Sequence, residues 1–182
     1  MLMKFVGCAT TVPMYMNKAA ATTDPVERLK LVMTHNFCWM NYEHKFVKPL
    51  NPILGETYQC HGQDGTKFFV EQTSHHPPRS HFQADGPDGA WSMNGWLDIE
   101  IYSGPLSSTA ISNGWKVAKF ADGGSIRWNP NHDKFTGIFM GIMNHQLTGK
   151  VTFHDEANDL TGFYEFGAYM WRKQDYVWGE MH

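Results

Sequence analysis

Two adjacent histidines stand directly before two adjacent prolines in the stretch EQTSHHPPRS, and a lysine opens the stretch KPLNPILGET earlier in the chain. Lys48 can donate three hydrogen bonds, and the rings of His75 and His76 can each donate a ring N–H. Charge-assisted hydrogen bonds are worth roughly 1.5–3 kcal/mol each, and a nearby phosphate favours a protonated imidazole. The three side chains therefore form a candidate clamp for a phosphate monoester. The four prolines of the two stretches would fix both loops in advance and lower the cost of ordering them.

The histidine pair has three other interpretations. A zinc site needs ligands that converge, but adjacent strand residues point to opposite faces, and neither HExxH nor H-x-H occurs in the sequence. A hydrolase using Ser74 with His75 would need chain neighbours to present a nucleophile and a base in the correct geometry. The simplest alternative is a turn with two surface histidines. The sequence has no G-x-S-x-G stretch and no glycine loop of the nucleotide-binding type.

Composition indicates a packed globular domain. The chain has 182 residues, of which 42% are hydrophobic and 14% aromatic, enough for one domain with a sizeable core. A net charge of -3 argues against general affinity for nucleic acid. The three cysteines, Cys8, Cys38 and Cys60, form no CxxC and are expected to be free thiols of a reducing compartment. The start has too short an apolar run for a secretory signal, and no stretch approaches a membrane span of about 20 apolar residues. We expect a cytoplasmic protein.

One helix and several strands should position the candidate clamp. In TTDPVERLKLVMTHNFCWM, Asp24 suits the N-cap, Pro25 the first helical position and Glu27 a capping box, with an apolar stripe at helical spacing beyond them. Downstream the period changes to two, in TKFFVEQ, GWLDIEIY, GWKVAKF, GKVTFHD and GFYEFGAYMW. In GWKVAKF, Trp115 and Val117 alternate with Lys116 and Ala118. Glycine-rich, Asp-rich or Asn-rich turns separate these segments. The pattern predicts a mainly β (α+β) domain: an antiparallel meander, wholly or partly closed into a barrel, with a helix packed on it.

The two candidate stretches resemble the signature segments of the oxysterol-binding-protein-related lipid-transfer domain. KPLNPILGETY at Lys48–Tyr58 resembles the first, and EQTSHHPP at Glu71–Pro78 resembles the second, which normally reads EQVSHHPP, so that only Thr73 departs from it. TDPVERL at Thr23–Leu29 resembles the segment that precedes the first motif. The resemblance covers nearly the whole chain, closely over 23–78 and more loosely beyond. It is far more specific than a single short pattern.

This resemblance implies a β-barrel around an apolar lipid tunnel with an N-terminal lid. Family members bind a sterol or another lipid and exchange it for phosphatidylinositol 4-phosphate, without an enzymatic reaction, a metal or a cofactor. The head-group residues of the family correspond to Lys48, His75 and His76, with Asn51 as a further candidate. Asn36 and Phe37, by position, correspond to the deep end of the tunnel. An ordinary boundary residue of an amphipathic helix is the alternative interpretation of Asn36.

The family's domain is considerably longer than this chain. We therefore expect residues 1–182 to form a single ligand-binding domain that lacks the lid and the C-terminal portion. An open sheet edge would then favour self-association. The expected function is lipid binding and transfer between membranes, with peripheral contact to membranes. A phosphoinositide-binding module without transfer is the first alternative, and a histidine-based metal-dependent hydrolase is the second.

Overall fold

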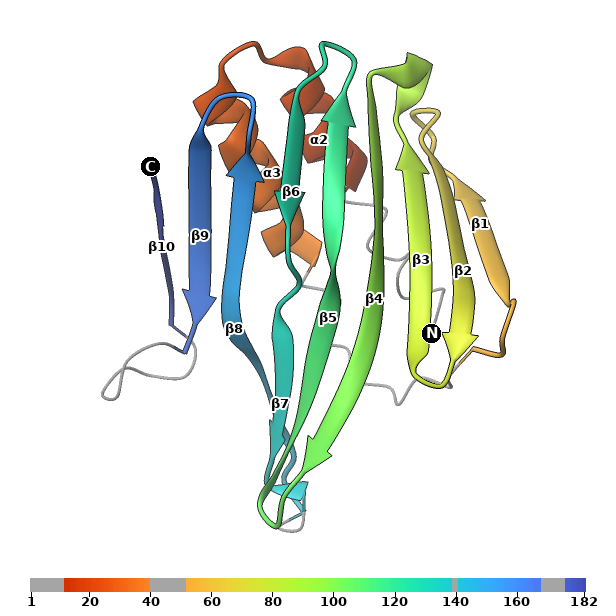
Figure 1. The fold of residues 1–182 in the computed structure, drawn as a ribbon, viewed down its shortest axis with the longest axis vertical. Helices are drawn as coiled ribbons and strands as arrows, with labels where there is room; N and C mark the ends of the chain where they lie inside the picture. Colours follow the sequence, from red (N-terminus) through yellow and green to blue (C-terminus); the bar gives the residue numbers. More distant parts are fainter. Residues whose placement is uncertain (1–11, 40–51, 139–140, 168–175) are drawn as a thin grey trace.

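The computed structural model describes residues 12–39, 52–138, 141–167 and 176–182. Within these ranges, two helices precede a ten-stranded antiparallel sheet (Figure 1). The helices are α2 (Val12–Ala21) and α3 (Pro25–Trp39). The strands are β1 (Thr57–His61), β2 (Lys67–His75), β3 (Pro78–Asp85), β4 (Trp91–Ser103), β5 (Ser107–Phe120), β6 (Ser125–Trp128), β7 (His132–Thr136), β8 (Asn144–Asp155), β9 (Leu160–Phe166) and β10 (Val177–Met181), with a short 3-10 helix η3 (Pro87–Gly89) between β3 and β4.

Most strands of the sheet pair with their neighbours in the chain. The order is β1-β2-β3-β4-β5-β6-β8-β9-β10. The remaining strand, β7, follows the short β6 in the chain and pairs with the same two neighbours, β5 and β8. Across the described residues, β1 and β10 are not paired with each other, so the sheet stays open between them. This confirms the predicted mainly β (α+β) fold, an antiparallel β-meander with a helix packed on it. The β-barrel is partial and not closed.

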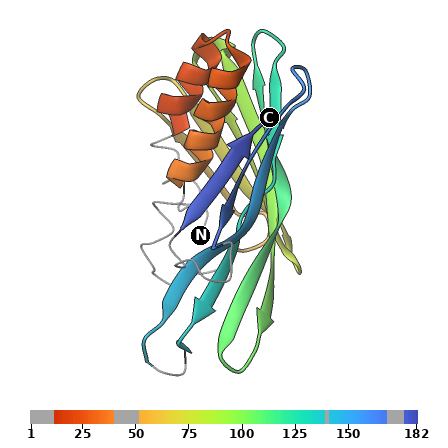
Figure 2. The same cartoon turned by 90° about the vertical axis from the view of Figure 1, so that its left-hand side faces the viewer.

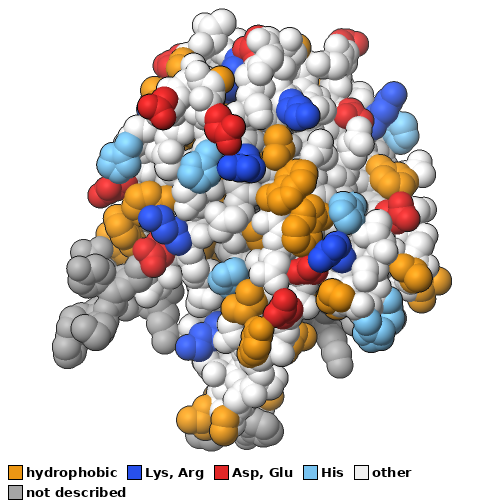
Figure 3. Space-filling view, in the orientation of Figure 1, with side chains coloured by type: hydrophobic (Ala, Val, Ile, Leu, Met, Phe, Trp, Pro, Cys, Tyr) orange, Lys and Arg blue, Asp and Glu red, His pale blue; other side chains and the backbone are white. Residues whose placement is uncertain are grey.

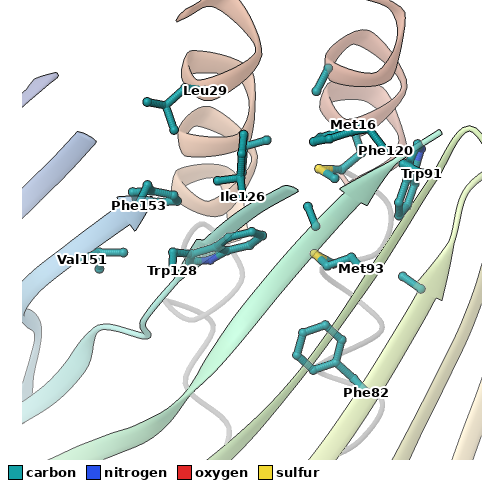
Figure 4. Close-up of a cluster of buried hydrophobic side chains, with 14 of the residues drawn as sticks. Met16, Leu29, Phe82, Trp91, Met93, Phe120, Ile126, Trp128, Val151 and Phe153 are labelled. Carbon is teal, nitrogen blue, oxygen red and sulfur yellow. The ribbon is translucent and has the colours of Figure 1, made fainter. Parts of the chain in front are cut away.

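Both helices pack against one end of one face, which we call the inner face (Figure 2). Helix side chains such as Met16 and Leu29 meet the sheet side chains Trp91, Trp128 and Phe153 in a single buried core (Figure 4). The buried residues Trp91 and Met93 alternate along β4 in the way that one covered face requires. The other end of the sheet extends beyond the helices.

The start of α3 agrees with the sequence prediction. The helix begins at Pro25, and the Asp24 carboxylate accepts a hydrogen bond from the Val26 backbone N–H at 3.0 Å. A second helix, α2, was not predicted from the sequence. Its alanines and the lysine in its last turn, Lys18, are helix-favouring features.

A buried arginine ties the two helices to the sheet. Arg28 donates to the Ala19 carbonyl at 3.0 Å and to the Thr22 carbonyl at 2.6 Å. It also donates to both carboxylate oxygens of Asp122, at 3.2 and 2.5 Å, and its guanidinium lies 4.7 Å from the Phe120 ring centroid. These bonds hold the pKa of the Asp122 carboxyl below its usual value. One side chain thus joins α2, α3 and the β5–β6 turn.

Candidate functional site

The histidine pair lies at the turn between β2 and β3, at the end of the sheet away from the helices. His75 ends β2 and is paired with Pro78, the first residue of β3, so His76 and Pro77 form the turn. Both imidazoles are exposed, and their ring centroids are 4.7 Å apart at 70°. The turn therefore brings together two side chains that a straight strand would separate, which leaves four ring nitrogens in one region.

A buried glutamine forms hydrogen bonds that stabilise the end of β2 before the turn. Its register shifts between Gln72 and Ser74. The Gln72 side chain, which is buried, donates to the Ser74 carbonyl at 2.8 Å and accepts from the Ser80 hydroxyl at 2.5 Å. Sequence reasoning did not single out Gln72. A glutamine on a strand face otherwise occupied by Phe68 and Val70 was the available signal.

Lys48 and Asn51 lie outside the described residues. The end of their motif is described, and it is fastened to β2. The Gly55 N–H donates to the Gln72 carbonyl at 2.8 Å, and the Gln72 N–H donates to the Glu56 carbonyl at 2.9 Å. Gly55 has φ of 77°, a conformation that favours glycine. The described end of the first signature stretch is thus a neighbour of the second in the fold.

Arg79, the nearest described arginine in sequence, is engaged elsewhere. It donates to Asp98 at 2.8 Å, and its guanidinium lies 4.6 Å from the Trp96 ring centroid. Asp98 is buried although the alternation of GWLDIEIY marks it as a polar-face residue. The ion pair fixes β3 to β4 close to the turn. Because Arg79 is bound to Asp98, the polar side chains exposed at the turn itself are those of the two histidines.

Asn36 lies at the centre of a buried polar cluster where α3 meets the inner face. Its side-chain oxygen accepts from Lys116 Nζ at 3.1 Å and from Trp128 Nε1 at 2.9 Å, and its amide donates to the Tyr164 hydroxyl. Asn36 is therefore a buried residue that joins the helix to three strands. Lys116, Trp128 and Tyr164 are members that sequence reasoning missed, because they are distant in sequence from Asn36 and from one another.

Phe37 follows Asn36 and is half exposed. Its ring makes an edge contact with Tyr164 at 5.7 Å and stacks on Phe166 at 6.3 Å between centroids. Phe153 extends this row of rings across the inner face to Trp128. The arrangement gives the inner face an aromatic wall beneath the last turns of α3, with the polar Asn36 cluster set into it.

His35, next to Asn36, is fully buried against Trp128, with ring centroids 6.5 Å apart. Burial, and secondly the charge of Lys116, lowers the pKa of His35 from its ordinary 6.5 to about 3. The imidazole is therefore neutral at physiological pH. It belongs to the helix–sheet contact and not to the histidine turn.

A separate cleft with a volume of about 670 Å³ lies at the helix end of the sheet. The β1–β2 and β3–β4 loops line it, together with Lys67, Trp91 and Lys119. It contains none of the predicted site residues and is on the opposite end of β2 from His75. Within the described ranges, no three His, Cys, Asp or Glu side chains gather closely enough to hold a metal ion. Neither described helix has the length and the apolar run of a membrane span.

Comparisons with known proteins show the family of this chain. The sequence profile described as oxysterol-binding protein matches residues 9–182. The chain belongs to the oxysterol-binding protein family. Oxysterol-binding protein 9 of Dictyostelium discoideum is 36% identical over 151 residues, which cover 81% of this chain and 35% of that protein. Human oxysterol-binding protein-related protein 6 is 48% identical over 88 residues, which cover 46% of this chain and 9% of that protein.

Solved structures of the family share the fold. The Osh1 ORD domain in complex with cholesterol superposes with a TM-score of 0.82 at 23% identity, covering 100% of this chain and 43% of that one. The Saccharomyces cerevisiae Osh3 ORD in complex with PI(4)P superposes with a TM-score of 0.74 at 19% identity, covering 94% and 46%. The chain therefore spans less than half the length of these relatives.

Proposed function

We propose that this protein binds a sterol or another lipid on the inner face of its sheet, binds phosphatidylinositol 4-phosphate at the two signature motifs, and moves lipid between membranes. It acts by binding and not by catalysis, as a cytoplasmic protein in peripheral contact with membranes. The observation that carries the proposal is the pair of backbone bonds between Gln72 and the Gly55–Glu56 segment. Through them the end of the lysine motif lies beside the strand that ends in the histidine pair.

The head-group site comprises Lys48, Asn51, His75 and His76. An inositol phosphate has several oxygens in different directions, so donors from two chain segments suit it better than donors from one. The ring centroids of the two exposed imidazoles are 4.7 Å apart, which is close enough for one phosphate to contact both rings. The Osh3 neighbour, which is bound to PI(4)P, is consistent with this assignment.

The lipid body would lie on the inner face beyond the helices. Phe37 offers a half-exposed ring there, and Leu97 and Ile99 belong to the part of β4 that the helices leave uncovered. Burying a few hundred Å² of apolar surface is worth roughly 10 kcal/mol before association costs. Asn36 and its polar cluster would face the polar group at the far end of such a lipid, in line with the Osh1 neighbour that binds cholesterol.

The test of the head-group site is binding to vesicles with and without phosphatidylinositol 4-phosphate. The variant Lys48→Ala, His75→Ala, His76→Ala is expected to lose at least about 100-fold in affinity for the phosphoinositide vesicles, because it removes several charge-assisted bonds. A matched variant, Lys67→Ala, His61→Ala, His182→Ala, also removes one lysine and two histidines, at exposed positions elsewhere, and should bind as the wild type does. Equal binding by both variants would remove the proposed residues from the site.

Mass spectrometry of lipids that co-purify with the chain tests separately whether the inner face holds a lipid, which transfer requires. A retained sterol or phospholipid supports a lipid-holding inner face. Phosphoinositide binding with no retained lipid would instead favour the alternative, a head-group-binding module without transfer, for which the open sheet between β1 and β10 is the supporting feature.

A further inference from the structure

The turns at the two ends of the sheet differ in polarity. At the helix end, the four turns β1–β2, β3–β4, β5–β6 and β8–β9 each carry at least one carboxylate, among them Asp64, Asp88, Asp122 and Glu156. At the other end, the β4–β5 and β7–β8 hairpins lie in two stretches, 101–115 and 135–144, that contain no charged residue and no histidine. Both stretches still contain the Ser, Gly or Asn that is usual in exposed turns, so the second end differs from the first in its lack of charge.

Large apolar side chains take the place of the charges. Six of them, which we call the apolar tips, are exposed at these two hairpins: Ile101, Tyr102, Leu106, Ile138, Ile142 and Met143. Leu106 is 80% exposed and Ile142 is 73% exposed, so neither contributes to the core. Such exposure of large aliphatic groups costs free energy in water and points to a partner that covers them.

The tips belong to two hairpins of one continuous part of the sheet. β5 pairs with β7, with Ser107 opposite Thr136, so the hairpins start side by side. Both project at the end of the molecule away from the helices, beyond the β2–β3 turn (Figures 1 and 2), and apolar side chains are visible at this end in the space-filling view (Figure 3).

The fold also sets how far the tips project. Asp98 of β4 is paired with Arg79, near the histidine turn, and β4 continues for five more residues, Ile99–Ser103. At about 3.3 Å per residue this is roughly 17 Å along the strand. Both hairpins have close backbone contacts at their ends. The Gly104 N–H donates a hydrogen bond to the Ser107 carbonyl at 2.8 Å. At Gly137 the chain passes so near the Ile142 carbonyl oxygen that an added Cβ would lie 2.0 Å from it.

We propose that the apolar tips are a membrane anchor that enters the lipid interface and directs the histidine turn toward the head groups. The inference rests on the proposed lipid-binding function, and it names the surface through which the membrane is contacted. A lipid surface accepts narrow, uncharged projections without shape complementarity, whereas a stable protein interface uses about 20–30 residues a side. Tyr102, whose hydroxyl donates to Glu100 at 2.7 Å, has the mixed apolar and polar character of residues at the interface. The carboxylates at the opposite end would be held away from an anionic bilayer.

Flotation of the full chain with phosphatidylcholine vesicles, with and without phosphatidylinositol 4-phosphate, tests the anchor. The variant Leu106→Asp, Ile142→Asp should lower the partition coefficient at least about tenfold on both kinds of vesicle, because two carboxylates would have to enter the interface. The control, Met14→Asp, Val26→Asp, adds the same charge at exposed apolar positions of α2 and α3 and should stay within about twofold of the wild type. Thermal melts confirm that both variants are folded.

Calorimetry with soluble glycerophosphoinositol 4-phosphate separates the anchor from the head-group site. The tip variant should bind this probe as the wild type does. If the wild type fails to bind the probe but its flotation still depends on the tips, the proposed head-group site is wrong and the anchor stands. Equal flotation of the wild type and the tip variant, or no flotation of the wild type, would overturn the anchor. So would a wild-type dimer that the tip variant dissociates while flotation is unchanged, because the tips would then bind a second copy.

Discussion

The helix-covered end and the open end of the sheet are built from the same strands but differ in burial. At the covered end, the inner face is filled by Met16, Leu29 and Trp128, and Arg28 joins both helices to the β5–β6 turn. At the open end, the strands continue without helices above them, and the polar groups of the His75–His76 turn are exposed. Stability is therefore concentrated at one end, and the surface available to ligands at the other.

The difference shows how one antiparallel sheet can combine a packed core with an exposed polar surface, the surface that is proposed to bind. Strands β4, β5 and β8 run through both ends, so the packed half holds the exposed half in register. Substitutions at the covered end should then change the free energy of unfolding, and substitutions at the open end should change binding alone. This separation can be broken or sharpened by experiment.

The largest expected effect is at Arg28. We expect Arg28→Ala to lower the free energy of unfolding by about 3 kcal/mol, because it leaves the Ala19 and Thr22 carbonyls without their donor and removes the buried guanidinium that pairs with the half-exposed Asp122. Urea unfolding followed by tryptophan fluorescence measures the change.

Arg127→Ala is the matched control for Arg28→Ala. The Arg127–Glu156 pair is 3.2 Å long, and its side chains are 56% and 78% exposed. Exposed pairs are worth about 0–1 kcal/mol, so the control should change stability little. A loss of equal size in the two variants would show that burial of Arg28 does not anchor the helices.

A second effect concerns pH. His35 is neutral in the folded protein because its pKa is lowered to about 3, whereas the unfolded chain takes up a proton below about 6.5. Acidification from pH 6.5 toward 3 should therefore destabilise the fold, by about 2.7 kcal/mol at pH 4.5 relative to pH 7.5. His35→Gln should flatten this part of the stability–pH curve, measured by urea unfolding at each pH, while His61→Gln at an exposed strand position should not. An unchanged slope in His35→Gln would assign the pH dependence to other groups.

Much of the fold could be predicted from the sequence because it depends on local patterns. The α3 boundary follows from Asp24 and Pro25, and the strands follow from alternation and turn residues. The inner face of β5 was harder. On the inner face, Lys116 reaches Asn36 and Ala118 is buried, while Trp115 lies partly exposed on the other face, so the larger apolar side chains do not mark the covered face. A lysine points inward because a buried polar cluster receives it, and that cluster is assembled from distant segments.

The candidate site was predictable in part for the same reason. His75 and His76 could be found because the signal is contiguous and the turn that unites them is local. The bracing by Gln72 and the attachment of Gly55 depend on pairing between strands and segments, which no single stretch encodes. The positions of Lys48 and Asn51 lie outside the described residues, so their place beside the histidines stays a prediction.

The smallest expected effect on stability is at the histidine turn. We expect His75→Ala, His76→Ala to change the free energy of unfolding by less than about 0.5 kcal/mol, because both side chains are exposed and contact mainly each other. The same urea titration as for Arg28→Ala measures this change. A loss comparable to that of Arg28→Ala would mean that the turn supports the fold, and reduced phosphoinositide binding by the variant could then be a consequence of unfolding. A neutral result, with Pro77 and Pro78 still fixing the turn, would leave the imidazoles free to serve binding alone.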